Sequence, residues 1–580
     1  MAELRRLLIA NRGEIAVRIV RACREMGIAP IVTVAPGDEA SMWAEVADEA
    51  EEVTSYLDGA GTVGAAVAAR ADAVHPGYGF LSEDPAFAEL VLEAGLRWVG
   101  PPPEAMRLLG DKVAARALAT EAGVPVVPGS EVAAGPTQDS ALLLAAEDLG
   151  VPLLVKAAAG GGGRGMRSVD DIAELQRALT AARQEAAAGF GDGRVFLERR
   201  LDDVRHVEVQ VLLDDHGHAV HLGERDCSLQ RRHQKLVEEA PSPAVSPELR
   251  STLGDAAIEI ARRAGYRGAG TAEFLVGKDG AWWFLEMNAR LQVEHPVTEE
   301  VTGIDLVRAQ LEIAEGSPLG FGQNDVVSRG HAIEARVYAE DPANGFLPTG
   351  GRVALLELPR WPGVRIDSAI RTGDDVGLGY DPLLAKVIAH AEDRTSALAK
   401  LRAALSEVRI VGVATNLGFL LDVLARAEFV DGTAGTDWVE RSWTGRVPAL
   451  PDGVRAEPAR SDPWIAFGRG GADDSAADVT VVGTHAQYRG WAYTIGDADL
   501  VADRMRGPDG ALTAPMPATV LEVDAKVGDA VEAGQVLALL EAMKIQVQVA
   551  SPAPGRVRAV HVRAGDVVAR GEPLIEMEEA

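Results

Sequence analysis

The stretch GTAEFLVGKDGAWWFLEMNARLQVEHP, residues 270 to 296, combines two apolar segments with an Asp-Gly pair between them. Asp279-Gly280 is a common turn of β-hairpins, so the segments are predicted to form paired antiparallel strands. With the turn centred on these two residues, Glu273 lies opposite Glu286. Like charges in that arrangement destabilise a sheet unless cations lie between them, which predicts a Mg²⁺ site. An odd-length loop would separate the carboxylates and weaken this interpretation.

Polar residues continue at every second position after Glu286 in the same stretch. Asn288, Arg290, Gln292 and Glu294 follow it, whereas the odd positions between them are apolar. In an extended chain this pattern gives one apolar face and one polar row. A half-exposed strand with a solvated side is the plain alternative. The carboxamide and guanidinium groups on the face of the suspected metal carboxylates favour a binding site.

A glycine-rich segment, VKAAAGGGGRGM, covers residues 155 to 166. Such a backbone folds closely over phosphates and offers N–H groups to them, although a flexible loop also explains a glycine run. It is not a P-loop, because no Gly-Lys-Ser/Thr sequence follows. A valine-rich strand delivers Lys156 just before the loop, and Lys112 starts a predicted helix. Two lysines beside a glycine flap are the parts expected of an ATP-grasp nucleotide site.

The composition of the 580 residues limits the classes of function. The length favours three to five domains. The net charge of −30 argues against a nucleic-acid partner, which needs a broad basic surface. No apolar run approaches the roughly 20 residues that span a bilayer, and the N-terminal run is too short for a signal peptide. Two cysteines, Cys23 and Cys227, fit a reducing compartment, so we expect a cytoplasmic protein without a membrane partner.

The C-terminal segment contains an internal repeat with a period of 37 residues. Residues 517 to 541 align without gaps on residues 554 to 578, with nine identical positions. Short alternating runs separated by Gly-Asp pairs and single glycines predict β-strands with tight turns. Each copy is too small to be stable alone, so the two are expected to form one flattened β-sandwich. Lys544 lies in the connection between the copies, at the tip of a predicted hairpin.

Several of these motifs resemble one known family. Glu541-Ala542-Met543-Lys544 is similar to the biotin attachment motif of biotin carboxyl carrier domains, in which the lysine amine forms an amide with biotin. Five other stretches resemble motifs of biotin carboxylase: NRGEIA (11–16), AVHPGYGFLSE (73–83), ERDCSLQRRHQKLVEEAP (224–241), the row of residues 286–294 and GHAIEARVYAEDP (330–342). The chain is therefore similar to the alpha subunit of biotin-dependent acyl-CoA carboxylases of the acetyl-, propionyl- or methylcrotonyl-CoA type.

The resemblance implies a multidomain α/β and α+β fold, in which an ATP-grasp biotin carboxylase precedes a small all-β biotinyl sandwich. A stand-alone lipoyl-type carrier would explain the repeat but not the ATP site, and another ATP-grasp ligase would explain only the ATP site. The expected units are an N-terminal α/β domain (1–110), an ATP-grasp domain (111–330), a biotin carboxylase C-terminal domain (331–446), a linker with a short β-rich docking segment (447–510) and a carrier domain (511–580).

The activity that the resemblance implies is carboxylation of biotin on Lys544, driven by ATP and bicarbonate through carboxyphosphate. Glu294 is expected to act as general base on bicarbonate, and Arg290 with Lys235 to hold the anion. Arg336 is expected to stabilise negative charge that develops on biotin. By matching positions, the resemblance implies that Glu273, Glu286 and Asn288 bind Mg²⁺ or Mn²⁺. The residues that it implies for nucleotide binding are Lys112, Lys156, Gly161, Gly162, Gly163, Gly165, Met166, Glu198, His206, Gln230 and His233.

Residues 447 to 510 are too few to hold a carboxyltransferase, so the chain is expected to be half of an enzyme. A separate β-subunit would carboxylate an acyl-CoA whose identity cannot be read from this chain. Two predicted short strands, 478–483 and 487–495, carry Tyr488, Trp491 and Tyr493, interpreted as exposed anchors for that partner. A small core within the segment is the alternative. A biotin protein ligase and a homo-oligomer within a larger complex are also expected.

Overall fold

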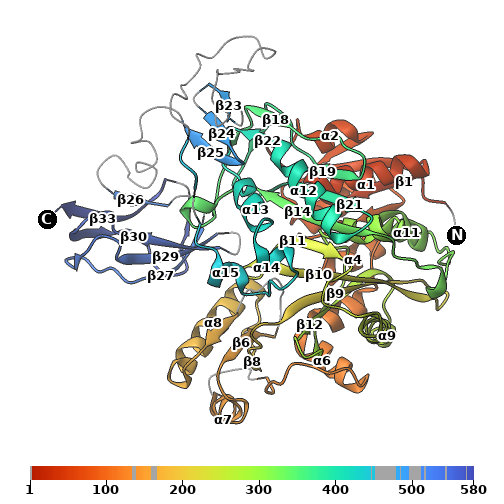
Figure 1. Ribbon diagram of the computed structural model, residues 1–580, viewed down its shortest axis with the longest axis horizontal. Helices are drawn as coiled ribbons and strands as arrows, with labels where there is room; N and C mark the ends of the chain where they lie inside the picture. The colour runs from red at the N-terminus through yellow and green to blue at the C-terminus, as the bar shows by residue number, and fades with distance from the viewer. Residues whose placement is uncertain are drawn as a thin grey trace.

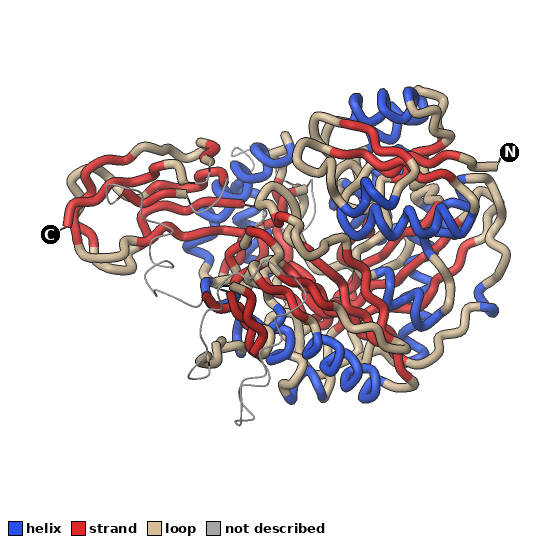
Figure 2. The backbone as a smooth tube through the Cα atoms, turned by 90° about the horizontal axis from the view of Figure 1, so that it is seen from above, coloured by secondary structure: helices blue, strands red, loops and turns tan. Residues whose placement is uncertain are grey.

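The computed structural model describes residues 3–132, 139–158, 166–445, 447–450, 479–483, 485–494, 511–514, 518–542, 545–569 and 571–579. Figure 1 shows a large body of helices and strands, with a smaller unit of strands beside it that contains the C-terminus. Figure 2, turned by 90°, shows the same smaller unit projecting from the body. Among the described residues, every helix is too short or too polar to cross a lipid bilayer.

The N-terminal unit is a parallel five-stranded sheet in the order β3-β2-β1-β4-β5. β1 (Arg6–Ile9) is the central strand of this sheet, and α1 (Gly13–Met26) follows it. α1 ends where Gly27 adopts the left-handed conformation, with φ of 73°. The remaining elements are β2 (Ala29–Val34), α2 (Met42–Val46), β3 (Glu49–Glu52), α3 (Gly59–Ala68), β4 (Ala73–His75), α4 (Pro85–Glu93), β5 (Arg97–Trp98), α5 (Pro103–Gly110) and α6 (Lys112–Glu121).

A small lobe follows, built on a three-stranded sheet in the order β7-β6-β8. Leu153, Val155 and Leu197 of this sheet pack against Leu175 and Leu179 in a separate hydrophobic cluster. A lobe with its own core is a structural unit distinct from the central sheet. Its elements are α7 (Asp139–Leu149), β6 (Leu153–Ala157), β7 (Arg167–Val169), α8 (Leu175–Phe190) and β8 (Val195–Arg199).

The centre of the molecule is an eight-stranded antiparallel sheet in the order β13-β12-β9-β10-β11-β14-β21-β19. The pairing of β11 with β14 carries this sheet across the expected domain boundary at residue 330. Its strands are β9 (Arg205–Leu213), β10 (Ala219–Arg231), β11 (Gln234–Ala240), β12 (Gly268–Val276), β13 (Trp282–Asn288), β14 (His331–Tyr338), β19 (Val364–Ser368) and β21 (Leu383–Ala391).

Helices and short strands complete the body around the central sheet. α9 packs on β9 and β10, and α12 packs on β14 and β21 (Figure 1). The helices are α9 (Pro247–Arg263), α10 (His295–Thr302), α11 (Leu306–Ala314), α12 (Arg394–Glu407), α13 (Leu417–Val423), α14 (Ala427–Val430) and α15 (Trp438–Ser442). The short strands are β15 (Glu340–Asp341), β16 (Leu347–Pro348), β17 (Gly351–Arg352), β18 (Leu355–Glu357), β20 (Asp375–Val376) and β22 (Arg409–Val411).

The expected docking segment forms a three-stranded sheet of β23 (Val479–Val482), β24 (His485–Tyr488) and β25 (Trp491–Thr494). The interpretation of its aromatics as exposed anchors is wrong. Tyr488 and Trp491 are only 5% and 6% exposed, and Trp491 packs into the core of the carboxylase body. The amide of Gly418 on α13 donates to the carbonyl of Gly490 at 3.1 Å, so the sheet is fastened to the body by its backbone as well.

The C-terminal unit confirms the predicted two-copy sandwich. Its strands are β26 (Ala511–Thr513), β27 (Ala518–Val523), β28 (Ala530–Val531), β29 (Val536–Ala542), β30 (Ile545–Ala550), β31 (Gly555–Val560), β32 (Val567–Val568) and β33 (Pro573–Glu579). β27, β28 and β29 correspond to β31, β32 and β33 with an offset of 37 residues. The copies exchange strands, because β28 pairs with β31 and β32 pairs with β27. The backbone pair of Ala542 with Ile545 closes the β29–β30 hairpin, whose connecting residue Lys544 lies outside the described part.

Candidate active site

The two opposed carboxylates of the central hairpin lie as the sequence predicts, since Glu273 on β12 pairs with Glu286 on β13. The predicted turn centre is wrong. Val276 pairs with Trp282, so the loop is odd-numbered and centred on Asp279. A β-bulge on β13 inserts one extra residue, Leu285, between the pairs. The bulge shifts the register by one residue and returns both carboxylates to the same face.

Glu273 is buried and gathers four donors around its carboxylate. Burial alone would raise the pKa of Glu273, but Lys235 and His206 hold it well below its usual range. Glu286 instead contacts the ammonium of Lys112 at 3.0 Å, so a different lysine faces each carboxylate. The donors to Glu273 are Asn288 Nδ2 at 2.8 Å, Lys235 Nζ at 2.9 Å, His206 Nε2 at 2.9 Å and Gln292 Nε2 at 3.0 Å.

The polar row that starts at Glu286 is extended only as far as Asn288, where β13 ends. Residues 289 to 294 turn into α10, so the prediction of one extended row to Glu294 is wrong. The turn nevertheless keeps the polar groups together, because Arg290 Nη2 donates to Asn288 Oδ1 at 3.1 Å. A solvated face is excluded for Gln292 and Glu294, which are each 2% exposed.

Glu294 lies between two cations that come from neighbouring strands. Lys235 Nζ on β11 contacts Glu294 Oε1 at 2.7 Å, and Arg336 Nη2 on β14 contacts Glu294 Oε2 at 2.9 Å. Burial would raise the pKa of Glu294, but Lys235, Arg336 and Arg225 hold it well below its usual range. Glu294 is therefore ionised at neutral pH and available to accept a proton.

Four further contacts hold the basic residues of this region in place. Lys235 Nζ also contacts Glu208 and Glu273, so one ammonium serves three carboxylates. Arg336 Nη2 contacts Glu238 Oε1 at 2.5 Å. Arg290 Nε contacts Glu83 Oε2 of the N-terminal unit at 3.0 Å. The basic residues expected at the anion end of the site therefore converge on one region of the central sheet.

The two lysines expected at the nucleotide approach each other from different elements. Lys112 begins α6 as predicted, and its backbone N–H donates to the carbonyl of Ala158, next to β6, at 3.0 Å. Lys156 lies on β6, where it pairs with Glu198 of β8. Burial would lower the pKa of Lys112, but Glu286 and Glu198 raise it. Glu198 thus lies within electrostatic reach of both lysines, at the junction of the small lobe and the central sheet.

The other expected nucleotide contacts have different surroundings. His233 lies in the tight turn between β10 and β11, with φ of 64°, where burial and the cations Lys156 and His206 lower its pKa to about 4. Gln230 is buried near the end of β10. Met166 is half-buried just before β7. Gly161, Gly162, Gly163 and Gly165 lie outside the described residues.

Sequence reasoning missed two buried charged residues of the site, Glu208 and Arg225. Arg225 Nε donates to Glu208 Oε1 at 2.5 Å, and its Nη2 donates to Gln292 Oε1 at 2.7 Å. Glu208 is one of the three carboxylates on Lys235. The signal was present in HVEVQV, residues 206 to 211, where polar and apolar side chains alternate along one strand. This alternation places His206, Glu208 and Gln210 on one face of β9.

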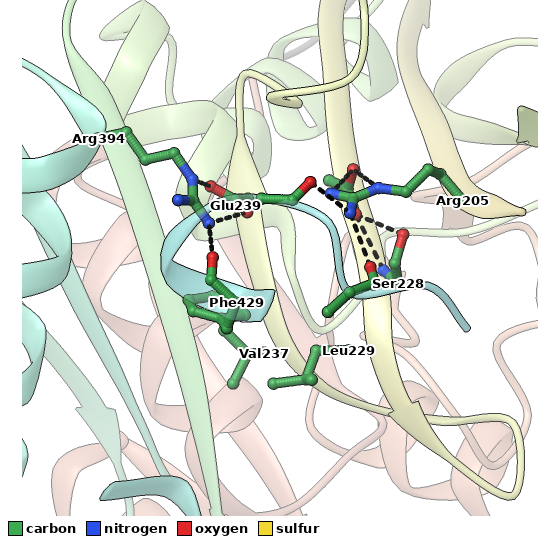
Figure 3. Close-up of a pocket in the computed structure, with 10 residues that line it drawn as sticks. Arg205, Ser228, Leu229, Val237, Glu239, Arg394 and Phe429 are labelled. Carbon is green, nitrogen blue, oxygen red and sulfur yellow. Dashed lines mark hydrogen bonds and ion pairs between the residues drawn. The ribbon is translucent and has the colours of Figure 1, made fainter. Parts of the chain in front are cut away.

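A small cavity lies on the opposite face of β10, where Asp226 and Ser228 alternate with Arg225 and Cys227. Figure 3 shows Arg205 and Arg394 reaching it from two sides. Arg205 pairs with Asp226 at 2.8 Å, and Arg394 pairs with Glu239 at 2.6 Å. The charged groups of the cavity pair with one another. Its lining residues come from the central sheet, α12 and the α14 region, on the face of the sheet opposite the site.

Four protein families match consecutive parts of the chain. "Biotin carboxylase, N-terminal domain" matches residues 3–106, and "Carbamoyl-phosphate synthase L chain, ATP binding domain" matches residues 111–321. "Biotin carboxylase C-terminal domain" matches residues 334–441, and "Biotin-requiring enzyme" matches residues 510–577. The matches cover the body and the C-terminal sandwich but leave residues 442–509 without one of these four families.

Similar proteins are known over the full length and for the body alone. The biotin-dependent acyl-coenzyme A carboxylase alpha3 subunit of Mycobacterium leprae is 39% identical, covering 100% of this chain and 99% of its own. The mitochondrial methylcrotonoyl-CoA carboxylase subunit alpha of Rattus norvegicus is 36% identical, covering 99% and 93%. The biotin carboxylase domain of Hydrogenobacter thermophilus 2-oxoglutarate carboxylase, crystallised with MgADP, ADP and bicarbonate, has a TM-score of 0.74 and 40% identity, covering 76% of this chain and 98% of its own.

Proposed function

This chain belongs to the family of biotin-dependent acyl-CoA carboxylase alpha subunits, and we propose that it carboxylates biotin carried on its own Lys544. It is an ATP-dependent biotin carboxylase joined to a carrier domain; it uses biotin, ATP and Mg²⁺, and bicarbonate is its substrate. The observation that supports the assignment of its chemistry to named residues is the placement of Glu294. An ionised, buried carboxylate is held between Lys235 and Arg336 at the end of the central sheet.

Glu294 acts as the general base on bicarbonate in this proposal. Its carboxylate takes the O–H proton of bicarbonate, and the freed oxygen attacks the γ-phosphorus of ATP. The bond to the β-phosphate oxygen breaks, which gives carboxyphosphate and ADP. Arg290 and Lys235 hold the bicarbonate anion next to the base. The low pKa of Glu294 keeps the base in its ionised form before bicarbonate binds.

Glu273, Glu286 and Asn288 fit a Mg²⁺ or Mn²⁺ site by the chemistry of their donors. Two carboxylates face each other across one strand pair, and a carboxamide oxygen lies on the same strand end. Hard divalent cations prefer such oxygen ligands and complete their shell with phosphate oxygens and water. A cation held there would neutralise charge on the phosphoryl group during transfer. Lys112 and Lys156 contribute point charges to the same phosphates.

The nucleotide itself is proposed to lie between the small lobe and the central sheet. Arg336 is assigned to the negative charge that develops on biotin, because it reaches Glu294 from the strand next to Lys235. Biotin would enter from this side, towards the base. The remaining nucleotide contacts are proposed for Gly161, Gly162, Gly163, Gly165, Met166, Glu198, His206, Gln230 and His233.

The partners proposed for this chain follow from its carrier domain. A biotin protein ligase would form the amide between biotin and Lys544. A carboxyltransferase β-subunit would then receive the carboxyl group and transfer it to an acyl-CoA, whose identity is decided on that subunit. A homo-oligomer within a larger cytoplasmic complex completes the proposal. The domain limits proposed are 1–110, 111–330, 331–446, 447–510 and 511–580.

The experiment that tests the role of Glu294 is the Glu294→Gln variant. A carboxamide keeps the shape of the side chain but cannot accept the proton, so bicarbonate-dependent ATP cleavage should fall by about 10²- to 10⁴-fold while ADP binding persists. Glu312→Gln, on the exposed face of α11, serves as the matched control and should keep the wild-type rate. Wild-type cleavage by Glu294→Gln would show that another group is the base.

A further inference from the structure

Lys386 is a fully buried lysine on β21 that lies directly behind the base. Its Nζ donates to the carbonyl oxygen of Val293 at 2.9 Å, and Val293 immediately precedes Glu294. The side chain of Lys386 is 0% exposed. Burying an ammonium costs several kcal/mol unless ion pairs and hydrogen bonds offset the lost solvation. The groups around Lys386 must therefore supply such ion pairs and hydrogen bonds.

Two stretches of the N-terminal unit supply the compensating contacts. Asn11 Nδ2 donates to the carbonyls of Pro76 and Tyr78, at 2.6 and 2.8 Å, and so joins the loop before α1 to the loop after β4. The hydroxyl of Tyr78 donates to Glu14 on α1. Glu14 Oε1 in turn pairs with Lys386 Nζ at 3.0 Å. The motifs NRGEIA and AVHPGYGFLSE thus converge on a single lysine.

A second carboxylate lies farther from the ammonium. Asp367 on β19 approaches Lys386 at 3.8 Å, but its closer partner is Arg365 at 2.7 Å. The ammonium therefore makes close contacts with one carboxylate, Glu14, and one carbonyl, that of Val293. Stability alone does not require this arrangement, since well-packed apolar residues can replace a buried ion pair without loss. The carbonyl contact gives the ammonium a specific target.

The register of the sheet places this contact beside the catalytic groups. Lys386 on β21 pairs directly with Arg336 on β14. Arg336 holds the side chain of Glu294, and Lys386 holds the carbonyl of the residue before it. Two paired residues on neighbouring strands therefore bind the Val293–Glu294 segment: Arg336 contacts its carboxylate and Lys386 contacts its backbone carbonyl.

We propose that Lys386 is a positioning residue, which fixes the Val293–Glu294 peptide so that the Glu294 carboxylate stays between Lys235 and Arg336. Glu14 and Tyr78 hold the ammonium in place, so the N-terminal unit contributes to the geometry of the base. The inference rests on the proposed role of Glu294. Its consequence is that losing the ammonium damages the bicarbonate end of the site and spares the nucleotide end, where Lys112 and Lys156 lie.

The test uses the double variant Lys386→Met with Glu14→Gln in the full chain. Both charges are removed together, so no unpaired ion remains between them. The kcat/KM for bicarbonate should fall at least about tenfold, because a displacement near 1 Å at a reacting group costs up to about a hundredfold in rate. The KM for ATP should stay within about twofold. Rates are expressed per nucleotide-binding site, measured with ADP, so that unfolded protein does not count.

The matched control is Lys400→Met. Lys400 Nζ also donates to a backbone carbonyl, that of His390 at 2.7 Å, but on α12 and away from the base. Equal losses for bicarbonate and ATP in the double variant, or a bicarbonate-specific loss in Lys400→Met, would overturn the inference. A purely structural role would lower the number of nucleotide sites and leave both KM values unchanged.

Two further variants, Glu14→Gln and Glu294→Gln, separate the positioning role of Lys386 from a folding defect and from the proposed role of the base. If the double variant fails to fold, Glu14→Gln alone carries the test, because glutamine keeps the size of the side chain and removes only the carboxylate charge that faces the Lys386 ammonium at 3.0 Å. Its KM for bicarbonate should rise while its KM for ATP does not, and unchanged values for both would refute the positioning role. Glu294→Gln is measured in parallel. A collapse in Glu294→Gln without a bicarbonate effect in the double variant removes this inference only, whereas an active Glu294→Gln removes the proposed base.

Discussion

At the scale of single residues, two buried lysines each meet several oxygen atoms. Lys235 contacts three carboxylates, and Lys386 serves a carboxylate and a carbonyl. An ammonium is a compact point charge with three donors, so it can face oxygen atoms that come from different elements. Only eight of the 57 lysines and arginines are lysines, which draws attention to these positions. It does not separate them from Lys278, whose side chain is 72% exposed and pairs with Asp203 at 3.5 Å.

The proposed metal carboxylates can be distinguished from the base by a single substitution. Glu286→Gln replaces a charged oxygen ligand with a neutral carboxamide on the strand opposite Glu273. The Mg²⁺ concentration for half-maximal ATP cleavage should rise at least about tenfold, and excess Mg²⁺ should restore most of the rate. The measurement is a Mg²⁺ titration at fixed ATP. Glu294→Gln should show no such rescue, and identical titrations for the two variants would contradict separate roles.

Lys544 is the proposed site of biotin attachment, and a single substitution tests it. Lys544→Arg keeps the positive charge but removes the primary amine that forms the amide, so streptavidin blotting should show no biotin on the full chain. Intact mass of the wild type should show one added biotinyl group. Lys526→Arg, in the same domain, is the control and should label normally. Persistent labelling of Lys544→Arg, or a mass increment of lipoyl, would exclude the assignment.

At the scale of elements, the limits of sequence reasoning depend on whether a pattern is local. The carrier strands repeat with an offset of 37 residues. They were predictable because the alternation of apolar and polar residues and the turn residues of each strand lie within that strand's own stretch of sequence. The active-site hairpin is different. The amide of Phe284 donates to the carbonyl of Pro125 at 2.8 Å, and Phe284 bridges to Val126, so the outer edge of β13 pairs with a distant segment. The bulge at Leu285 lies directly beside this contact, and a local pattern of Asp-Gly and alternation contains neither.

The same distinction applies to the candidate site. Glu273, Glu286, Lys235 and Glu294 were predicted from motifs and are brought together by the fold. Glu208 and Arg225 lie opposite each other on the consecutive strands β9 and β10, but a register shift between His221 and Glu224 hides this pairing from the sequence. Even so, the alternating residues of β9 were visible in the sequence.

The attachment of the β23–β25 sheet to the body yields a prediction for an element. A Cβ on Gly418 would lie 2.4 Å from Trp491 Nε1, which real Cβ atoms do not reach. Gly418→Ala should therefore push Trp491 away and lower the free energy of unfolding by about 1–3 kcal/mol in chemical denaturation. Gly64→Ala in α3 is the control, because a Cβ there meets nothing within 4 Å. Equal stabilities of the two variants would show that the sheet is not held by this contact.

At the scale of the whole molecule, the chain contains a carboxylase body and a carrier but, in the described part, no further unit of comparable size. A carboxyltransferase must build a pocket for coenzyme A and an oxyanion site, which takes a domain of hundreds of residues. The purified chain should therefore carboxylate free biotin with ATP and bicarbonate and leave acyl-CoA untouched. Radiolabelled bicarbonate measures both products. Adding a β-subunit should restore acyl-CoA carboxylation, and acyl-CoA carboxylation by the chain alone would contradict the division of labour.

The buried seat of the β23–β25 sheet also limits the distance between the carboxylase body and the carrier. Gln487 Nε2 donates to Val408 O at 2.9 Å, and the amide of Ile410 donates back to Gln487 Oε1 at 2.7 Å, so β24 is tied to the body beside β22. Sixteen positions, 495–510, separate this sheet from the first strand of the carrier in the sequence. Standard covalent geometry lets a chain of that length reach at most about 60 Å. Such a covalent connection gives the carrier an effective concentration on the order of millimolar at the site. The rate of carrier loading per molecule should therefore not change on dilution.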